Sequence, residues 1–205
     1  MTKKYLDKAY GHKRGDEATR LYDEWAQSYD EETEENGYAT PRRCAEALSA
    51  AVGPDFVGAV LDLGCGTGLS GAALRAAGFK IIDGWDPSAA MLQRAEPRRV
   101  YRVLRHIDPD ARLTARTGVY SAAVAVGVMS PGLAPPEAID QVLDLLPSGA
   151  HFCFSINDHA VKDGAHLRRI DTLSAEGAAE VVFKEYGPHL PGRDMRSWVY
   201  VLRKL

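Results

Sequence analysis

Cysteine is scarce in this 205-residue chain: Cys44, Cys65 and Cys153 are far apart and form no CxxC pair. That spacing disfavours a disulfide framework and a cysteine-rich zinc site, and it favours a reducing compartment such as the cytoplasm. Long apolar runs are missing too. The longest, residues 120–129, has the length of a strand, whereas a membrane-spanning helix needs about 20 residues. The polar start of the chain also lacks the apolar core of a signal peptide. We therefore expect a soluble cytoplasmic protein that does not contact a membrane.

An excess of one charge is also lacking. The chain has 25 Lys and Arg residues against 28 Asp and Glu residues, a net charge of −3, so electrostatics gives no reason to expect nucleic acid as a partner. The six histidines show no H-x-x-x-H pair, and we expect no metal. With 45% hydrophobic residues, the chain is long enough for one core and short for two domains. A single domain over 1–205 is expected.

The first 57 residues have helical patterns and no strand pattern. Thr40 and Pro41 form a favourable helix start, with Thr40 as N-cap and Pro41 in the first turn. The neighbouring Arg42 and Arg43 are expected to be solvated. We expect this region to supply an arm and lid helices over a sheet core at 58–205. Its expected segments are an arm or short helix at 1–15, a helix at 16–30, a solvated acidic connector at 31–35 and a helix at 40–52.

From residue 58 onward, strands alternate with helices, a pattern typical of a parallel sheet with helices on both faces. The last two strands have no helix between them, so they should pair antiparallel. The prediction is an α/β fold: a Rossmann-like, doubly wound, seven-stranded sheet, mostly parallel with an antiparallel C-terminal strand pair. The expected strands are 59–63, 81–85, 103–107, 120–128, 150–156, 180–186 and 197–203.

The most informative segment is a glycine turn that directly follows the first expected strand. Gly64, Gly66 and Gly68 alternate with other residues before a helix begins. Glycine lets the backbone turn sharply and approach a ligand without a Cβ in the way. In a doubly wound sheet this turn lies at the carboxyl edge of the strands, where ligands bind. A turn that needs glycine for geometry alone is the alternative.

The surroundings of the turn disfavour two common nucleotide sites. A dinucleotide turn, G-x-G-x-x-G/A, needs a small residue where this chain has Leu69, and the phosphate loop G-x-x-x-x-G-K-[ST] is absent. Asp86 ends the next expected strand, and a carboxylate there can accept both hydroxyls of a ribose. A glycine turn with a ribose acid and no phosphate clamp points to adenosine without a diphosphate.

These residues also carry a family resemblance. Asp62-Leu-Gly-Cys-Gly-Thr-Gly68 resembles the first motif of class I S-adenosylmethionine-dependent methyltransferases, and Asp86-Pro-Ser with Met91 resembles the end of their second strand. Residues 125–129, 145–149 and the terminal strand pair fit later motifs of that fold. The segment 22–30, Tyr-Asp-Glu-Trp-Ala-Gln-Ser-Tyr-Asp, is similar to the first helix of small-molecule members. With Gly37-Tyr38 and Pro41, it resembles the methyltransferase-like proteins of the Williams–Beuren region.

The resemblance implies S-adenosylmethionine as cofactor and S-adenosylhomocysteine as product. It places Asp62 near the methionine ammonium, Asp86 on the ribose, and Asp108 near the adenine amino group. The chain departs from the family at Pro109, which lacks the backbone N–H usually offered to the adenine ring. The implied cofactor-binding residues are Tyr22, Tyr29, Asp62, Gly64, Cys65, Gly66, Gly68, Asp86, Pro87, Met91, Asp108 and Gly127.

Candidate acceptor-binding residues come from the first long helix and from two loops. Tyr22, Trp25 and Tyr29 recur at helical spacing, so they form either a core stripe or a cover over the methionine end of the cofactor. His159 follows the fifth expected strand and is the first candidate for a general base, with Tyr29 second; an exposed loop histidine is the alternative. The candidate substrate-binding residues are Trp25, Asn157, His159 and His189.

The sequence therefore predicts a methyltransferase acting on a small molecule through an oxygen, nitrogen or sulfur nucleophile. Two other functions stay open: a protein methyltransferase, and a catalytically silent protein that binds S-adenosylmethionine. The oligomeric state is left undetermined.

Overall fold

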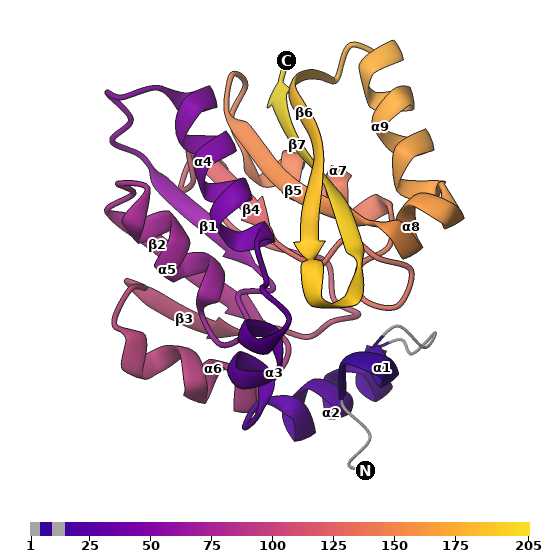
Figure 1. The fold of residues 1–205 in the computed structure, drawn as a ribbon. Coiled ribbons are helices and arrows are strands. Elements are labelled where there is room, and N and C mark those ends of the chain that lie inside the picture. The colour runs from indigo at the N-terminus through magenta and orange to yellow at the C-terminus, as the bar shows by residue number, and fades with distance from the viewer. Residues whose placement is uncertain (1–4, 10–14) are drawn as a thin grey trace.

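A computed structural model describes residues 5–9 and 15–205, so the rest of the arm expected at 1–15 lies outside the described residues. Its centre is a seven-stranded sheet in the order β3-β2-β1-β4-β5-β7-β6 (Figure 1). The first five strands in this order are parallel, and β7 pairs antiparallel with both β5 and β6. This confirms the predicted fold class. The strands are β1 Ala59–Leu63, β2 Ile81–Asp86, β3 Val103–His106, β4 Ala122–Ala125, β5 His151–Asn157, β6 Ala179–Leu190 and β7 Met195–Lys204.

Helices cover both faces of the sheet because the central strands bury side chains in both directions. On one face Val60 of β1 packs with Leu48 and Leu74, which come from α4 (Thr40–Val52) and α5 (Leu69–Ala76). On the other face Leu61 packs with residues of α7 (Glu137–Leu145), α8 (Asp158–Asp163) and α9 (Ala165–Ala175). All five residues of β1 are buried, which fixes the start of the glycine turn in the centre of the molecule.

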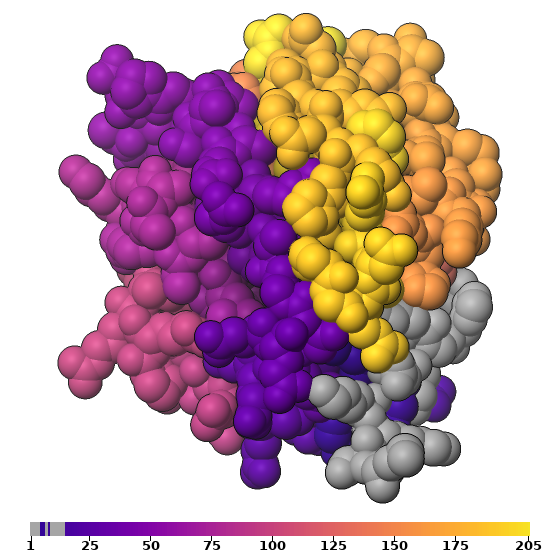
Figure 2. Space-filling view, in the orientation of Figure 1, coloured from indigo at the N-terminus to yellow at the C-terminus, as the bar shows by residue number. Residues whose placement is uncertain are grey.

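The N-terminal helices pack at one end of the sheet, near the turn between β6 and β7 (Figure 1). They are α1 (Tyr5–Ala9), α2 (Gly15–Trp25) and α3 (Tyr29–Glu35). Leu6 and Trp25 form a small apolar cluster with Leu190 at the end of β6. In the space-filling view the N-terminal segment, in indigo, lies along the C-terminal hairpin, in yellow (Figure 2). The N-terminal helices and the turn of the C-terminal hairpin therefore meet over the carboxyl edge of the sheet.

The acidic connector expected at 31–35 was a wrong prediction, because these residues belong to α3. Acidic side chains in a first helical turn are stabilised by the helix dipole. Glu32 is buried at 9% exposure, and its carboxylate accepts hydrogen bonds from the Ser28 hydroxyl at 3.0 Å and the Leu6 backbone N–H at 3.4 Å. Glu32 therefore joins α1 to α3, whereas Glu31, Glu34 and Glu35 are exposed, as expected for solvated acids.

Two expectations for the start of α4 were also wrong. The helix covers the predicted residues, but Ala39 is its N-cap, and the Thr40 hydroxyl lies 2.7 Å from His189 Nδ1. Arg43 is not solvated: it is 9% exposed, and its guanidinium donates to the carbonyls of Glu185, Pro188 and Ser197. The side chains of Thr40 and Arg43 both bind the hairpin of β6 and β7. The sequence around residue 40 does not reveal this distant partner.

Two further differences surround the carboxyl edge. α8 was not expected; the Asn157 side-chain oxygen accepts the Ala160 N–H and caps it. β4 is shorter than expected, because the chain leaves the sheet before Gly127, which has φ +74°. Ser88 caps α6 (Ala89–Ala95). No helix within 5–9 and 15–205 has the length and apolar character needed to cross a membrane.

Candidate functional site

The glycine turn connects β1 to α5 in a tight geometry. The backbone N–H groups of Gly64 and Cys65 both donate to the Trp85 carbonyl, at 2.7 and 3.2 Å. Gly64 has φ +69°, and a Cβ added to it would lie 2.3 Å from Cγ2 of Val128. At Gly66, with φ +54°, an added Cβ would meet nothing within 4 Å. The turn therefore needs glycine for packing at Gly64 and leaves open space at Gly66.

Asp86 lies at the end of β2, next to this turn. Its two oxygens accept the backbone N–H groups of Gly66 and Ser88, each at 2.8 Å, and the Ser88 hydroxyl in turn accepts the Met91 N–H at the start of α6. Burial raises the pKa of Asp86 to about 6, and the two backbone hydrogen bonds oppose that shift. The carboxylate thus holds the turn and α6 together, and its remaining lone pairs are free to accept donors from a ligand.

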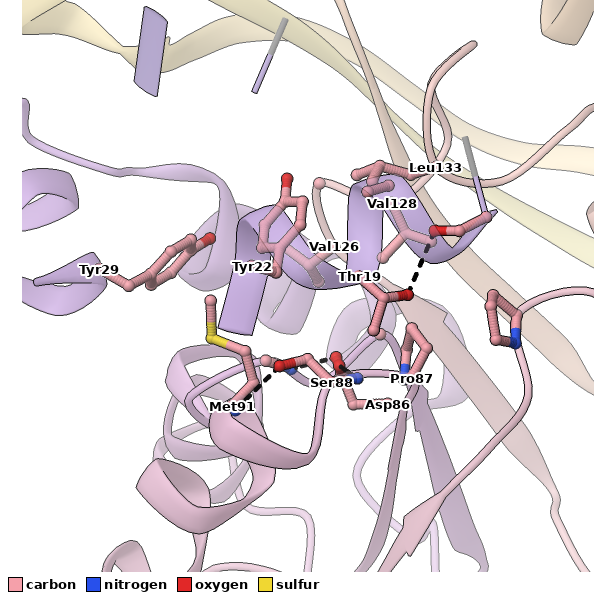
Figure 3. Close-up of a pocket in the computed structure, with 16 residues that line it drawn as sticks. Thr19, Tyr22, Tyr29, Asp86, Pro87, Ser88, Met91, Val126, Val128 and Leu133 are labelled. Carbon is pink, nitrogen blue, oxygen red and sulfur yellow. Dashed lines mark hydrogen bonds between the residues drawn. The ribbon is translucent and has the colours of Figure 1, made fainter. Parts of the chain in front are cut away.

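A cavity lies between the turn, the end of β2 and α2. We call it the cofactor cavity. Figure 3 shows Thr19 and Tyr22 of α2 facing Asp86, Ser88 and Met91 across it. Its lining residues are Gly15, Ala18, Thr19, Tyr22, Tyr29, Gly64, Gly66, Asp86, Pro87, Ser88, Met91, Pro109, Val126, Gly127, Val128 and Leu133.

Eight of the twelve cofactor candidates are brought together in this lining, while Asp62, Cys65, Gly68 and Asp108 are outside it. Asp62 is fully buried below the turn. One of its oxygens accepts the hydroxyls of Ser70 and Tyr101, each at 2.7 Å, and the other has no partner. Burial raises its pKa to about 6. Asp108 is exposed and accepts the Asp110 N–H. Cys65 lines a smaller cavity of about 250 Å³ behind the turn.

A second cavity adjoins the first; we call it the aromatic cavity. The two share Tyr22, Tyr29, Gly127 and Leu133. Three of the four substrate candidates, Trp25, Asn157 and His189, are in its lining. The other lining residues are Leu6, Thr33, Tyr38, Ser130 and Leu190.

His159, the first candidate for a general base, is not in either lining. It is exposed on α8, because Asn157 starts that helix and carries the following residues away from the carboxyl edge. His189 is buried in the aromatic cavity instead, at 3% exposure. Burial lowers its pKa to about 4, so this imidazole is neutral at pH 7. The structure therefore brings a different histidine to the site from the one that chain order favours.

Two carboxylates fasten the N-terminal helices over the cofactor cavity. Asp23 of α2 accepts the Ser88 hydroxyl at 2.5 Å and the Ala90 N–H at 3.2 Å. Asp30 of α3 accepts the Thr67 hydroxyl at 2.5 Å and pairs with the Arg98 guanidinium. The lid is thus held on both sides of the glycine turn. Neither acid was singled out from the sequence.

Several lining residues were missed, and some had a readable signal. Ala18 and Thr19 precede Tyr22 by about one turn of α2, so the same helical periodicity includes them. Val126, Val128 and Leu133 are in the irregular segment after β4, whose path no periodicity predicts. Within the described residues, no group of three or more His, Cys, Asp or Glu side chains could hold a metal ion.

Comparison with known proteins decides the family. A family model described as a methyltransferase domain matches residues 29–199. The chain belongs to this methyltransferase family. This membership confirms the resemblance of its motifs to those of class I S-adenosylmethionine-dependent methyltransferases. The glycine turn, the open space at Gly66 and the buried Asp86 carboxylate at the cavity wall fit an adenosine-containing cofactor.

A curated relative of the chain agrees with the family assignment. It is 35% identical over 131 residues to methyltransferase-like protein 27 from Homo sapiens, a match that covers 63% of this chain and 54% of the relative. The chain thus spans about half the length of that curated relative. Solved structures at low identity show the fold alone.

Three structures illustrate the fold. The [4+2]-cyclase SpnF has a TM-score of 0.70 at 17% identity, covering 94% of this chain and 96% of that chain. A methyltransferase from Thiobacillus denitrificans in complex with S-adenosylhomocysteine has a TM-score of 0.58 at 15% identity, and the match covers 84% of this chain and 96% of that chain. The N-methyltransferase NodS from Bradyrhizobium japonicum, also with S-adenosylhomocysteine, has a TM-score of 0.59 at 19% identity. The match covers 80% of this chain and 85% of that chain.

Proposed function

We propose that this methyltransferase transfers a methyl group to a small molecule that binds in the aromatic cavity. The observation that carries the proposal is the wall shared by the two cavities, formed in part by Tyr22 and Tyr29 of the lid. A cavity lined in large part by the protein's own N-terminal helices suits a small ligand better than a polymer. We propose a single domain in which α2 and α3 form the lid; α4 packs on the sheet instead, so the lid is shorter than the expected 1–57.

We place the cofactor in the larger cavity through the residues that line it. Asp86 accepts the ribose hydroxyls, the backbone of Gly64 and Gly66 lets the nucleoside approach, and Pro87 and Met91 flank the adenine. Tyr22, Tyr29 and Gly127 are then next to the sulfonium end. Asp62 acts from below by holding Ser70 and Tyr101 under the turn, and its unpartnered oxygen suits an ammonium group near the turn.

S-adenosylmethionine supplies a methyl group on a positively charged sulfur that accepts an electron pair from a nucleophile. The protein's task is to hold that nucleophile about 3–3.5 Å from the methyl carbon and to exclude water. The lining side chains of the aromatic cavity are uncharged, with His189 neutral at pH 7. A nitrogen or sulfur nucleophile that needs no strong base suits this environment better than a hydroxyl.

Label transfer tests the nature of the acceptor. Protein supplied with S-adenosylmethionine carrying a tritiated methyl group is incubated with a cell extract separated into small-molecule and macromolecular fractions. We expect label in the small-molecule fraction. Label in the protein fraction would favour a protein methyltransferase instead. Cofactor binding without transfer to either fraction would favour a silent binding protein.

Replacing Asp86 with alanine should weaken binding of S-adenosylmethionine and S-adenosylhomocysteine by about 1.5–3 kcal/mol, because charge-assisted hydrogen bonds to the ribose are lost. Titration calorimetry measures both affinities. Asp83→Asn is the matched control: Asp83 is a buried acid on the same strand, but it binds Arg102 and Tyr120 and does not line the cavity. This control should lose stability and keep the affinity; equal losses in both variants would refute the ribose assignment.

The raised pKa of Asp86 predicts a pH dependence of cofactor binding. Ribose hydroxyls donate to the ionised carboxylate, so binding must displace a proton once the pH falls below about 6. The affinity for S-adenosylhomocysteine should be constant above about pH 7 and fall about tenfold by about pH 5. Calorimetry across this range measures the change. Asp86→Asn should remove most of the dependence, and an unchanged profile in that variant would assign the titration to another group.

A further inference from the structure

The aromatic cavity presents nitrogen donors to whatever binds in it. His189 is the most informative, because its hydrogen bonds determine which ring nitrogen carries the proton. Its Nδ1 lies 2.7 Å from the Thr40 hydroxyl, and that hydroxyl lies 3.3 Å from the hydroxyl of Ser197. Arg43 donates to the Ser197 oxygen at 3.1 Å. Thr40 and Ser197 are fully buried, so each hydroxyl hydrogen needs an acceptor within this group.

Only one arrangement of hydrogens satisfies these contacts. The arginine can only donate, so Ser197 accepts from Arg43 and its own hydrogen points to Thr40. Thr40 then accepts from Ser197 and donates to Nδ1 of His189. The opposite direction would leave the Ser197 hydrogen without an acceptor. Nδ1 is therefore the unprotonated nitrogen, and Nε2 carries the hydrogen on the side of the ring away from Thr40.

Two more residues of the same lining carry N–H groups. Asn157 uses its oxygen to cap α8, which leaves its Nδ2 amide as the polar group for a ligand. Trp25 is 2% exposed, and its indole Nε1 has no hydrogen-bond partner. A buried donor without a partner costs about 1–3 kcal/mol, so a ligand that supplies an acceptor is favoured here.

We propose that the aromatic cavity recognises a carboxylate or carbonyl group on a small planar molecule, with His189 Nε2–H and Asn157 Nδ2–H as donors. The rings of Tyr22, Trp25 and Tyr29, which contact one another edge to face or tilted, hold the planar apolar part. Arg43 is three hydrogen bonds behind His189 and is paired with Glu185, so the N–H donors themselves favour an acceptor group on the ligand. The low pKa of His189 agrees with a neutral imidazole that donates from one nitrogen.

The proposal deepens the proposed function by naming the class of acceptor, and it is testable without knowing the acceptor. Protein saturated with S-adenosylhomocysteine is titrated with benzoate and, separately, with benzylamine. We expect benzoate to bind at least about tenfold more tightly than benzylamine, because only benzoate pairs with the donors. Tighter binding of benzylamine, or binding of neither probe, would overturn the proposal. The cofactor titration itself would stand, so the two claims fail separately.

Variants of His189 separate donation from mere filling of space. His189→Leu should weaken benzoate binding about tenfold, and His189→Gln should recover most of it, because the glutamine amide places an N–H near the position of Nε2. Binding of S-adenosylhomocysteine by each variant shows that it has folded. Equal benzoate affinity in the leucine and glutamine variants would contradict a hydrogen-bonding role.

Nitrogen NMR of the wild-type imidazole tests the hydrogen-bond direction without any substitution. The Nε2–H tautomer is expected, with the Nδ1 resonance at the position of an unprotonated nitrogen that accepts a hydrogen bond. Thr40→Val should shift the Nδ1 resonance or the tautomer balance, and Thr40→Ser should restore the wild-type signal. A wild-type ring protonated on Nδ1 would overturn the inference.

Discussion

Replacing Gly64 with alanine is expected to lower the free energy of unfolding by about 3 kcal/mol. The residue has φ +69°, where an L side chain costs about 1–2 kcal/mol. The added Cβ would also lie 2.3 Å from Cγ2 of Val128, and such overpacking costs about 1–3 kcal/mol. Valine is stiff at χ1, so the backbone of the turn must move. Urea denaturation followed by circular dichroism measures the loss.

Two alanine substitutions separate the parts of this effect. Gly177 has φ +68° and nothing within 4 Å of an added Cβ, so Gly177→Ala should show backbone strain alone, about 1 kcal/mol. Gly66→Ala should lose a similar amount of stability, but its Cβ enters open space in the cofactor cavity. This substitution should therefore weaken the binding of S-adenosylhomocysteine by about tenfold or more. If Gly64→Ala and Gly177→Ala lose the same free energy of unfolding, the packing argument is contradicted.

Replacing Arg43 with leucine is expected to destabilise the protein by roughly 3 kcal/mol. The guanidinium donates to three backbone carbonyls and to the Ser197 hydroxyl, and each buried acceptor left unsatisfied costs about 1–3 kcal/mol, partly relieved by water. The ion pair with Glu185 contributes little, because that side chain is 58% exposed. Thermal and urea unfolding measure the loss.

The next residue along the chain provides the control for Arg43. Arg42 has a side chain that is 74% exposed and an ion pair with Glu46 at 3.4 Å. Arg42→Leu should change stability by no more than about 0.5 kcal/mol. Glu185→Gln should have a similarly small effect, which separates the backbone contacts of Arg43 from its ion pair. Equal losses in the Arg42 and Arg43 variants would show that the hairpin contacts contribute nothing.

Local pattern predicts the sheet and the cofactor side of the site well. The central strands β1, β2, β4 and β5 are short and largely buried, so these strands and the glycine turn follow from periodicity and spacing. Asp86 could be singled out because it ends the strand after Gly64 and Gly66. These residues are near one another in the fold because consecutive strands β1 and β2 are neighbours in the sheet.

The acceptor side depends on contacts between distant parts of the chain. Thr40 and His189 meet across 149 residues, and nothing local indicates that the threonine hydroxyl bonds an imidazole instead of capping α4. His159 seemed closer to the methyl position from chain order alone, but the unexpected α8 turns it outward. Arg43 had a readable signal: it is on the same stripe of α4 as Thr40 and Ala47, which are buried.

The most direct test of the central claim is a crystal structure of the protein grown with S-adenosylhomocysteine. The account predicts the ribose hydroxyls within hydrogen-bond distance of the Asp86 carboxylate, the adenine between Pro87 and Met91, and the sulfur facing the wall of Tyr22 and Tyr29 toward the aromatic cavity. Density for the ligand outside this cavity, or a ribose held by Asp108 with Asp86 left uncontacted, would contradict it.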